Sequence, residues 1–257
     1  MTAGADTLLY EKRGRVAHIT INRPESMNAL NRATQAAIAD AWEEMGRDPD
    51  ILVGIITGAG GRAFSAGMDL KERADDTEAG NTGPMRTVWN VELWKPVIAA
   101  IDGFCVAGGL EISLYCDFRI ATAKSQFGLP EPRWSLLAGY GLHNLSRMTT
   151  LGNALYMQLT GNRVSAEDAL RMGLIQEVLP NRDALMERAE KLADDIQLCA
   201  PLAVQAIKRI VMTGKNMPIE YAQKLSADTN KLIQQTEDSV EGPKAFAEKR
   251  PPVWKMG

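Results

Sequence analysis

Histidine and cysteine are scarce in this chain of 257 residues, which contains two of the former and three of the latter. Two histidines, His18 and His143, cannot build a three-histidine zinc site, and we expect no bound metal. The cysteines form an odd, widely spaced set without a C-x-x-C pair, at Cys105, Cys116 and Cys199. Such a set is typical of reduced thiols in the cytosol, and we interpret all three as core cysteines.

Long apolar runs and clusters of basic residues are also absent. No stretch reaches the roughly 18 apolar residues of a membrane span, and residues 1–10 lack the apolar core of a signal peptide. The formal net charge is −3, the pI is near 5.6, and the basic side chains are dispersed. Nucleic acids and anionic membranes both attract a concentrated positive surface, so neither is predicted as a partner. We expect a soluble, cytoplasmic protein.

The chain does contain a large apolar fraction, 45%, in patterns that alternate between strand and helix. Runs rich in β-branched residues predict strands, and a helical apolar spacing over residues 30–45 separates the first two. The alternation in the first strand places His18 on its more polar face. Strands that alternate with helices indicate a mainly parallel, buried sheet. The predicted strands cover residues 16–22, 51–57, 97–101, 118–122 and, more weakly, 175–179.

The second part of the chain changes to helical stripes. Pro201 and Pro218 mark the starts of two predicted helices. We therefore divide the chain into an α/β core, residues 1–180, and a helical C-terminal region, residues 181–257. Within the core, residues 75–84 are rich in Asp, Glu, Gly and Thr and are predicted to form a loop.

Two short motifs suggest other chemistries, and each fails on its context. Residues 58–63 follow a strand and fit G-x-G-x-x-(G/A), but residues 64–67 would break the helix that a dinucleotide-binding motif requires. Ser65 is not part of G-x-S-x-G, because Ala63 occupies the first glycine position. The sequence therefore argues against a nicotinamide enzyme and against a serine hydrolase.

Two glutamates follow strand-like runs at glycine or proline positions. Glu111 lies in the first turn of a predicted helix over residues 110–116; the N–H groups there can bind an anion, and a carboxylate there also fits simple compensation of the helix dipole. Glu131 stands between two prolines, which restrict the backbone and fix where the carboxylate points. Together with the glycine-containing segment 64–69, the two carboxyls suit proton transfer next to a carbonyl.

Four motifs occur in one order: FSAGMDL (Phe64–Leu70), GFCVAGGLE (Gly103–Glu111), DFRIA (Asp117–Ala121) and FGLPE (Phe127–Glu131). They resemble those of the enoyl-CoA hydratase/isomerase (crotonase) superfamily, and the resemblance extends over essentially the whole chain. It implies an α/β, crotonase-like fold of repeated ββα units with a helical C-terminal trimerisation region. It also implies a homotrimer or a dimer of trimers.

The resemblance implies an acyl-CoA substrate whose thioester oxygen lies between the backbone N–H groups of Ala66 and Gly108. Glu111 is expected to activate water as a base, and Glu131 to protonate the α-carbon. No permanently bound cofactor is implied, because coenzyme A enters as part of the substrate. Contacts with coenzyme A are expected from Ser26, Met27, Ala66, Gly67, Met68, Asp69, Leu70 and Gly108.

Both glutamates are present, whereas isomerase members often manage with one, so we predict an enoyl-CoA hydratase that adds water reversibly to a 2-enoyl-CoA. Two alternatives within the superfamily are a dehydratase acting on a hydroxyacyl-CoA such as carnitinyl-CoA and an enoyl-CoA isomerase. An acyl-CoA-binding subunit without turnover is the alternative from another class.

The segment after Glu131 departs from the Pro-Gly-Ala-Gly-Gly of many hydratases. Arg133 is a candidate partner for Glu131 or for an acidic acyl group; pairing with Glu131 would make that carboxyl harder to protonate. Trp134 is expected to pack into a gap between helix and sheet. Trp89 and Trp94 are candidates for the border of the acyl pocket.

Overall fold

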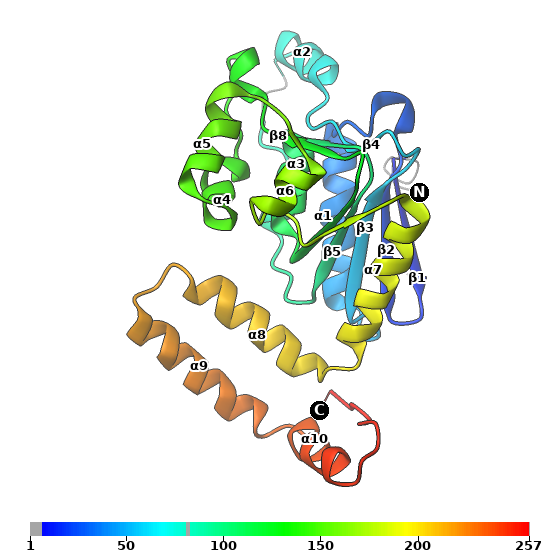
Figure 1. Cartoon of the computed structure of the whole chain (residues 1–257), viewed down its shortest axis with the longest axis vertical. Helices are drawn as coiled ribbons and strands as arrows, with labels where there is room; N and C mark the ends of the chain where they lie inside the picture. The colour runs from blue at the N-terminus through cyan, green and yellow to red at the C-terminus, as the bar shows by residue number, and fades with distance from the viewer. Residues whose placement is uncertain (1–6, 81–82, 257) are drawn as a thin grey trace.

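The computed structural model describes residues 7–80 and 83–256, which form two β-sheets with helices around them (Figure 1). In the larger sheet β1 and β2 pair antiparallel, and all other neighbours pair parallel. Its strands, in spatial order, are β1 (Leu8–Arg13), β2 (Val16–Ile21), β3 (Val53–Gly58), β5 (Val97–Ile101), β7 (Phe118–Thr122) and β10 (Glu177–Leu179). The smaller sheet consists of β4 (Ala63–Ser65), β6 (Phe104–Val106), β8 (Gln126–Gly128) and β9 (Val164–Ser165).

Ten α-helices and three short 3₁₀ helices occur in the described residues. The α-helices of the first two-thirds of the chain are α1 (Arg32–Arg47), α2 (Leu70–Glu78), α3 (Gly108–Tyr115), α4 (Tyr140–Met148), α5 (Leu151–Thr160) and α6 (Ala166–Arg171). Those that follow are α7 (Arg182–Gln197), α8 (Pro201–Gly214), α9 (Ile219–Ile233) and α10 (Asp238–Ala247). The 3₁₀ helices are η1 (Pro24–Ser26), η2 (Val88–Asn90) and η3 (Glu131–Trp134).

The predicted ββα repeat is confirmed by the element order. The chain runs β1–β2–α1, β3–β4–α2, β5–β6–α3 and β7–β8–α4, with only short 3₁₀ turns interposed. In the last three repeats the first strand joins the larger sheet and the second joins the smaller one. The strands β4, β6 and β8 therefore lie side by side, although about 40 residues separate β4 from β6.

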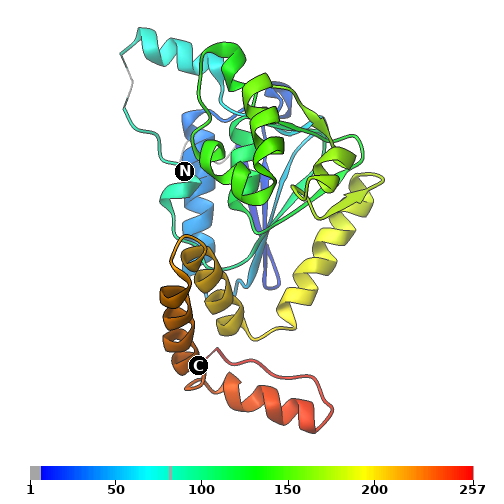
Figure 2. The same ribbon diagram turned by 60° about the vertical axis from the view of Figure 1, so that its left-hand side comes forward.

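The larger sheet is buried on both faces because helices cover each of them. Alternate residues of β3 point to opposite sides: Ile56 packs in the cluster that contains Trp42 of α1, and Ile55 packs in the cluster that contains Leu185 of α7. Figures 1 and 2 both show α7 lying along the sheet. His18 is therefore buried under α7 rather than on a polar face, and its Nε2 lies 3.5 Å from a carboxylate oxygen of Glu190.

The last three helices extend away from the α/β part. Helices α8 and α9 form a hairpin beyond the sheets, and α10 follows at its base (Figure 2). Only Pro201 is buried in α8, and no residue is buried in α9. Helix α7 packs on the sheet. The helices that do not pack on it therefore begin with α8, at residue 201. No single helix in residues 7–80 or 83–256 has the length and apolar character of a membrane span; only α7 and α8 jointly pass that test, across a bend of 104°.

Several local expectations need correction. Residues 75–78 belong to α2 rather than to a loop: Asp69 caps the start of the helix and accepts a hydrogen bond from the N–H of Glu72, and at the other end the N–H of Ala79 donates to the carbonyl of Asp75 at 2.9 Å. Residues 81 and 82 of that predicted loop lie outside the described residues. The core interpretation of the cysteines holds for Cys105 and Cys116, which are buried, but Cys199 is exposed.

Candidate active site

Three parallel strand ends bring the predicted motifs together. Because β4, β6 and β8 run in the same direction, the residues that follow them meet at one edge of the smaller sheet. Met68, Gly108 and Glu131 follow these strands and, with Glu111, line one cavity of about 440 Å³. A neighbouring apolar cavity of about 510 Å³ includes Glu131 but none of the glycine-containing segments. The first cavity is therefore the candidate active site.

The free N–H group of the first loop lies two residues after Ala66, the predicted donor. The N–H of Ala66 donates to the carbonyl of Met27 at 3.0 Å, so it is already occupied. The next residues pair with Leu30, whose N–H donates to the carbonyl of Gly67 at 2.7 Å and whose carbonyl accepts from the N–H of Asp69 at 3.1 Å. In such a ladder the intervening N–H faces the other way. The N–H of Met68 accordingly has no acceptor among the described residues and lies in the wall of the cavity.

The second donor is the N–H of Gly108, the first residue of α3. A helix leaves its first N–H groups without a partner inside the helix. Ala107, just before it, has φ 51° and ψ −132°, a sparsely populated conformation that redirects the chain into α3. Gly67 has φ 85°, and a Cβ there would lie 2.4 Å from the Cβ of Ala107 and 2.9 Å from the nitrogen of Gly108. Glycine at this position therefore lets the two loops touch, which brings both free N–H groups into one cavity.

Glu111 is buried in α3 with one carboxylate oxygen held in place. Its Oε1 accepts a hydrogen bond of 2.7 Å from the N–H of Gly141, the second residue of α4. Burial raises the pKa of Glu111, although backbone N–H groups of residues 139–141 act in the opposite direction. The carboxyl is thus oriented by the protein and holds its proton more strongly than an exposed glutamate.

Glu131 begins η3 directly after Pro130 and is 8% exposed. Its Oε2 is buried and has no hydrogen-bond partner within the described parts of the chain. Burial raises the pKa of Glu131 to about 7, and the negative charge of nearby Glu111 adds to the rise. A carboxyl with this pKa is present in both protonation states near neutral pH, as a group that delivers and recovers a proton must be.

The residues after Glu131 point elsewhere than expected. Arg133 does not pair with Glu131: its Nη2 donates to Oδ1 of Asn162 at 2.6 Å and its Nε to the carbonyl of Thr160 at 3.3 Å. Trp134 is not packed into a gap, because it is 66% exposed at the edge of the active-site cavity. The proton on Glu131 is therefore free of a competing cation from this segment.

Of the two tryptophans considered for the border of the acyl pocket, only Trp89 lines the cavity. Trp89 lines the cavity and stacks on Tyr140 with ring centroids 5.6 Å apart and an interplanar angle of 11°. Trp94 lies outside the cavity, 6.0 Å from the guanidinium of Arg209. Stacked aromatic rings add about 0.5–1.5 kcal/mol beyond their buried area, so Trp89 fixes the start of α4 next to the amide that holds Glu111.

The residues expected to contact coenzyme A fall into two groups. Leu70 and Met68 line the cavity, as do Ala66 and Gly108, whereas Ser26, Met27, Gly67 and Asp69 are absent from its lining. Of the latter, Met27 and Gly67 hold the first loop through the backbone bonds described above. Asp69 accepts from Nη1 of Arg23 at 3.0 Å in addition to capping α2.

Sequence reasoning missed the N–H of Gly141 as a partner of Glu111 and the N–H of Met68 as the free donor. No local pattern indicates the first, because the contact joins residues 30 positions apart. The second follows from the alternation of N–H directions along a strand. That alternation identifies the free amide only when the pairing with Leu30 is known.

Comparison with known proteins identifies the family. The sequence profile of the enoyl-CoA hydratase/isomerase family matches residues 11–257. The (E)-benzylidenesuccinyl-CoA hydratase of Thauera aromatica is 41% identical over 95% of this chain and 97% of its own length. The carnitinyl-CoA dehydratase of Salmonella typhi is 36% identical over 98% of this chain and 99% of its own.

A solved structure agrees over the whole fold. The crystal structure of enoyl-CoA hydratase EchA1 from Mycobacterium marinum superposes with a TM-score of 0.91 at 37% identity, covering 98% of this chain and 100% of that chain. Fold and site together define an enzyme of the crotonase type, with hydratase-type activity on coenzyme A thioesters. The chain belongs to the enoyl-CoA hydratase/isomerase family.

Proposed function

We propose that this enzyme adds water reversibly to a 2-enoyl-CoA. The observation that carries the proposal is the pair of buried carboxyls, Glu111 and Glu131, in one cavity with the free N–H groups of Met68 and Gly108. Two N–H groups suit a thioester oxygen that gains negative charge, and two carboxyls suit a water that loses one proton while the α-carbon gains another.

In the proposed reaction the thioester oxygen binds between the N–H groups of Met68 and Gly108. Glu111 takes a proton from water as the water oxygen bonds to the β-carbon, and the double-bond electrons move toward the thioester oxygen. The α-carbon then takes the proton of Glu131, which restores the carbonyl. Net addition of water leaves the proton on Glu111 and the charge on Glu131, and exchange between the two carboxyls or with solvent resets the site. Each donor N–H contributes about 10²–10³-fold in rate.

The environments of the two glutamates support these roles. Glu111 is oriented by the N–H of Gly141, a donor that favours its ionised form and therefore its action as a base. Glu131 lacks such a donor at Oε2 and has a pKa of about 7, which favours a proton ready for transfer. Because two adjacent carboxyls titrate together, the labels describe the reactive protonation state of the pair.

The reverse direction, dehydration of a hydroxyacyl-CoA, is the second candidate. It uses the same groups with each proton moving backwards, and a relative at 36% identity is named carnitinyl-CoA dehydratase. Which direction predominates depends on the acyl group. A pure isomerase is less favoured, because a double-bond shift needs one carboxyl and the cavity contains two.

The test is an acyl-CoA panel incubated in heavy-oxygen water, with products followed by mass spectrometry. We expect incorporation of one labelled oxygen per 3-hydroxyacyl product, and loss of it in Glu111→Gln and in Glu131→Gln. Unchanged turnover in both variants would refute the site assignment. A shifted double bond without label would indicate an isomerase, and acyl-CoA binding without any product would indicate a binding subunit.

We further propose that coenzyme A runs along residues 66–70 with Ser26 and Met27 near its outer end. The helical C-terminal region is proposed to assemble the chain into a homotrimer or a dimer of trimers, in the cytoplasm. Apolar side chains on that region support the assembly: Ile207 of α8 is 62% exposed, and Tyr221 of α9 is 66% exposed. Two copies of one apolar surface bury each other when the chain associates with itself.

A further inference from the structure

One cation in the wall of the active-site cavity has no acidic partner within residues 7–80 and 83–256. Arg73, on α2, lines the 440 Å³ cavity and also the adjoining polar cavity. Arg73 is exposed toward these cavities, and within the described residues the one hydrogen-bond contact of its side chain is with the thioether of Met68, with Nη1 3.2 Å from the sulfur. A thioether is a weak acceptor, far weaker than a carboxylate for a guanidinium. Arg73 is therefore a strong donor that has no matching acceptor in the described part of the chain.

The acids around Arg73 are engaged with other groups. Three of them line the adjoining polar cavity, and each has a hydrogen-bond or ion-pair partner that is not Arg73. These contacts are Asp69 with Arg23 at 3.0 Å, Glu72 with the N–H of Arg32 at 2.8 Å, and Asp76 with Nε of Arg32 at 2.6 Å. Asp69 and Asp76 are paired with arginines, and Glu72 accepts a hydrogen bond from a backbone N–H, so none of the three forms an ion pair with the guanidinium of Arg73.

A second donor of the same cavity is placed in the same way. Gln35 of α1 is 7% exposed, lines the cavity, and its Nε2 lies 3.5 Å from the sulfur of Met85. Its carbonyl oxygen makes no hydrogen bond in the described part of the chain. A primary amide that lines a cavity and has only a thioether partner is available to hydrogen-bond a ligand. Arg73 and Gln35 thus both line the cavity with N–H donors whose only acceptors in the described residues are thioether sulfurs.

We propose that the acyl group of the substrate carries, besides the thioester, a carboxylate that binds Arg73 and accepts a hydrogen bond from Gln35. This inference rests on the proposed function and specifies its substrate class. The guanidinium is suited to a carboxylate because it presents paired N–H donors to the two oxygens. It also offsets the repulsion that such a substrate would meet from the ionised carboxylate of Glu111.

The position of Arg73 distinguishes a substrate carboxylate from the phosphates of coenzyme A. Its side chain contacts Met68, whose own N–H is the proposed donor to the thioester oxygen. The phosphates are separated from that oxygen by the whole pantetheine arm. Arg73 also lines the same cavity as Gly108, Glu111 and Glu131, which supports a place near the reacting end of the ligand over one near its nucleotide end.

Equilibrium binding of saturated acyl-CoAs tests the proposal without any reaction. Two matched pairs differ only in a terminal carboxylate: succinyl-CoA with butyryl-CoA, and adipoyl-CoA with hexanoyl-CoA. By calorimetry we expect at least one acidic member to bind about tenfold more tightly than its neutral partner, a factor typical of a charged hydrogen bond. Arg73→Met should abolish that preference, Arg73→Lys should retain part of it, and Gln35→Leu should reduce it.

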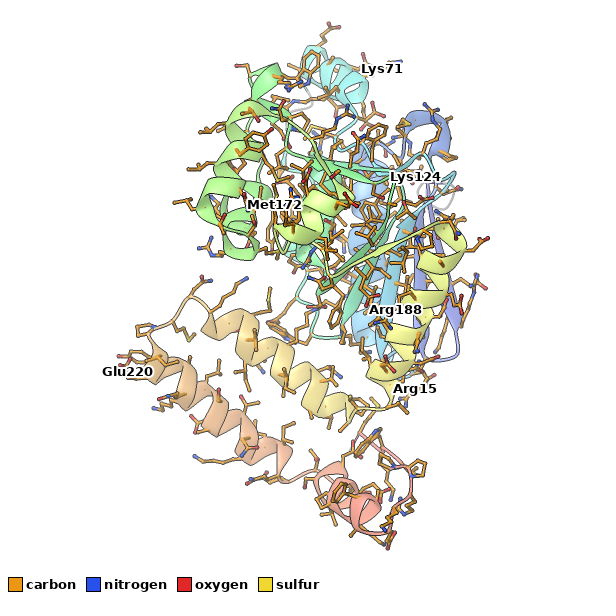
Figure 3. All side chains as sticks on the ribbon, in the orientation of Figure 1. Arg15, Lys71, Lys124, Met172, Arg188 and Glu220 are labelled. Carbon is orange, nitrogen blue, oxygen red and sulfur yellow. The ribbon has the colours of Figure 1, made fainter. Side chains whose placement is uncertain are left out.

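Lys71 provides the matched control, because it is the other cation of α2 (Figure 3) and is absent from the cavity lining. Lys71→Met should leave the ratio between acidic and neutral members unchanged. The proposal is overturned if the native enzyme binds both members of each pair equally, or if Arg73→Met weakens acidic and neutral members alike, as loss of a phosphate contact would. A retained acidic preference without labelled oxygen in any product would refute hydration while leaving the carboxylate site intact.

Discussion

The carboxyl of Glu111 on α3 accepts a hydrogen bond from the N–H of Gly141 on α4 at 2.7 Å. A Cβ on Gly141 would lie 3.0 Å from a methyl group of Leu129 and 3.4 Å from Cγ of Glu111, so alanine there crowds Leu129 and stands directly against the Glu111 side chain. We predict that Gly141→Ala lowers kcat by up to about 10²-fold, the cost of a misplacement near 1 Å. Steady-state kinetics with crotonyl-CoA measure it.

Gly152 offers the control for that substitution. It lies in α5, where an added Cβ meets no atom within 4 Å. Gly152→Ala should keep full activity and raise the free energy of unfolding by up to about 1 kcal/mol, since alanine favours a helix. Equal losses of activity in both variants would argue that Gly141 has no particular role in placing Glu111.

The pKa of about 7 at Glu131 predicts how activity depends on pH. Hydration requires this carboxyl to be protonated, so kcat/KM, which reports the ionisation of the free enzyme, should fall as the pH rises above about 7. Glu131→Gln should lose most of the activity, about 10²–10⁴-fold, and the residual rate should lack this limb of the profile. A native profile that stays flat from pH 6 to 9 would be incompatible with Glu131 as the acid.

The same carboxyl predicts a trend in stability. Its folded-state pKa lies above its ordinary value of 4.5, so the folded state binds the proton more tightly than the unfolded chain. The stabilisation of the fold by this bound proton is complete at pH values below about 4.5, and it is lost as the pH rises through 7. Glu131→Gln should therefore raise the melting temperature relative to the native enzyme more at pH 8 than at pH 5, as measured by calorimetry.

The roles of the two backbone N–H groups at residues 66 and 68 can be distinguished by replacing each N–H in turn with an ester oxygen. Replacing the backbone N–H of residue 68 by an ester oxygen keeps the methionine side chain but removes the proposed donor, and we predict a loss of about 10²–10³-fold in kcat. The same replacement at residue 66 removes the bond to Met27 and should lower stability by about 1 kcal/mol with a smaller effect on kcat. The opposite ranking of the two esters would restore Ala66 as the donor.

Much of this architecture could be predicted because strand and helix patterns differ in period. The buried strands around Ile55, Ile98 and Ile120 were evident as apolar, β-branched runs, and the four motifs indicated the ββα repeat. The composition of residues 75–78 favours a loop, but α2 continues through them to Glu78, and the N–H of Ala79 still donates to the carbonyl of Asp75. Helical hydrogen bonds that follow a capped start prevail there over local composition.

The site was predicted at the level of loops and not of atoms. Glu111 and Glu131 were evident from glycine and proline punctuation, and they do share one cavity. Which amide is free depends on pairing with Leu30, a contact between segments that sequence alone does not align. The direction of Arg133 likewise depends on Asn162, at the end of a distant helix. Long-range partners decide both questions, and the sequence does not encode them at fixed spacing.

The exposed face of the α8–α9 hairpin predicts self-association. Ile207 and Val211 lie one helical turn apart on α8, with exposures of 62% and 58%, and Leu232 on α9 is 65% exposed. Burial of a side chain of this size contributes about 1.5–3 kcal/mol, and a buried charge in its place costs more than that. We predict that Ile207→Glu shifts the native assembly toward single chains, as measured by sedimentation velocity at micromolar concentration.

Gln223→Glu is the matched control, because it adds the same negative charge at an exposed position of α9 without removing apolar surface. Its assembly should equal that of the native protein. Since the active-site cavity is lined by residues of the α/β part, Ile207→Glu should retain measurable turnover even as separate chains. A native protein that sediments as a single chain at every concentration would contradict the assigned role of this hairpin, and identical assembly of Ile207→Glu and the native protein would place the interface elsewhere.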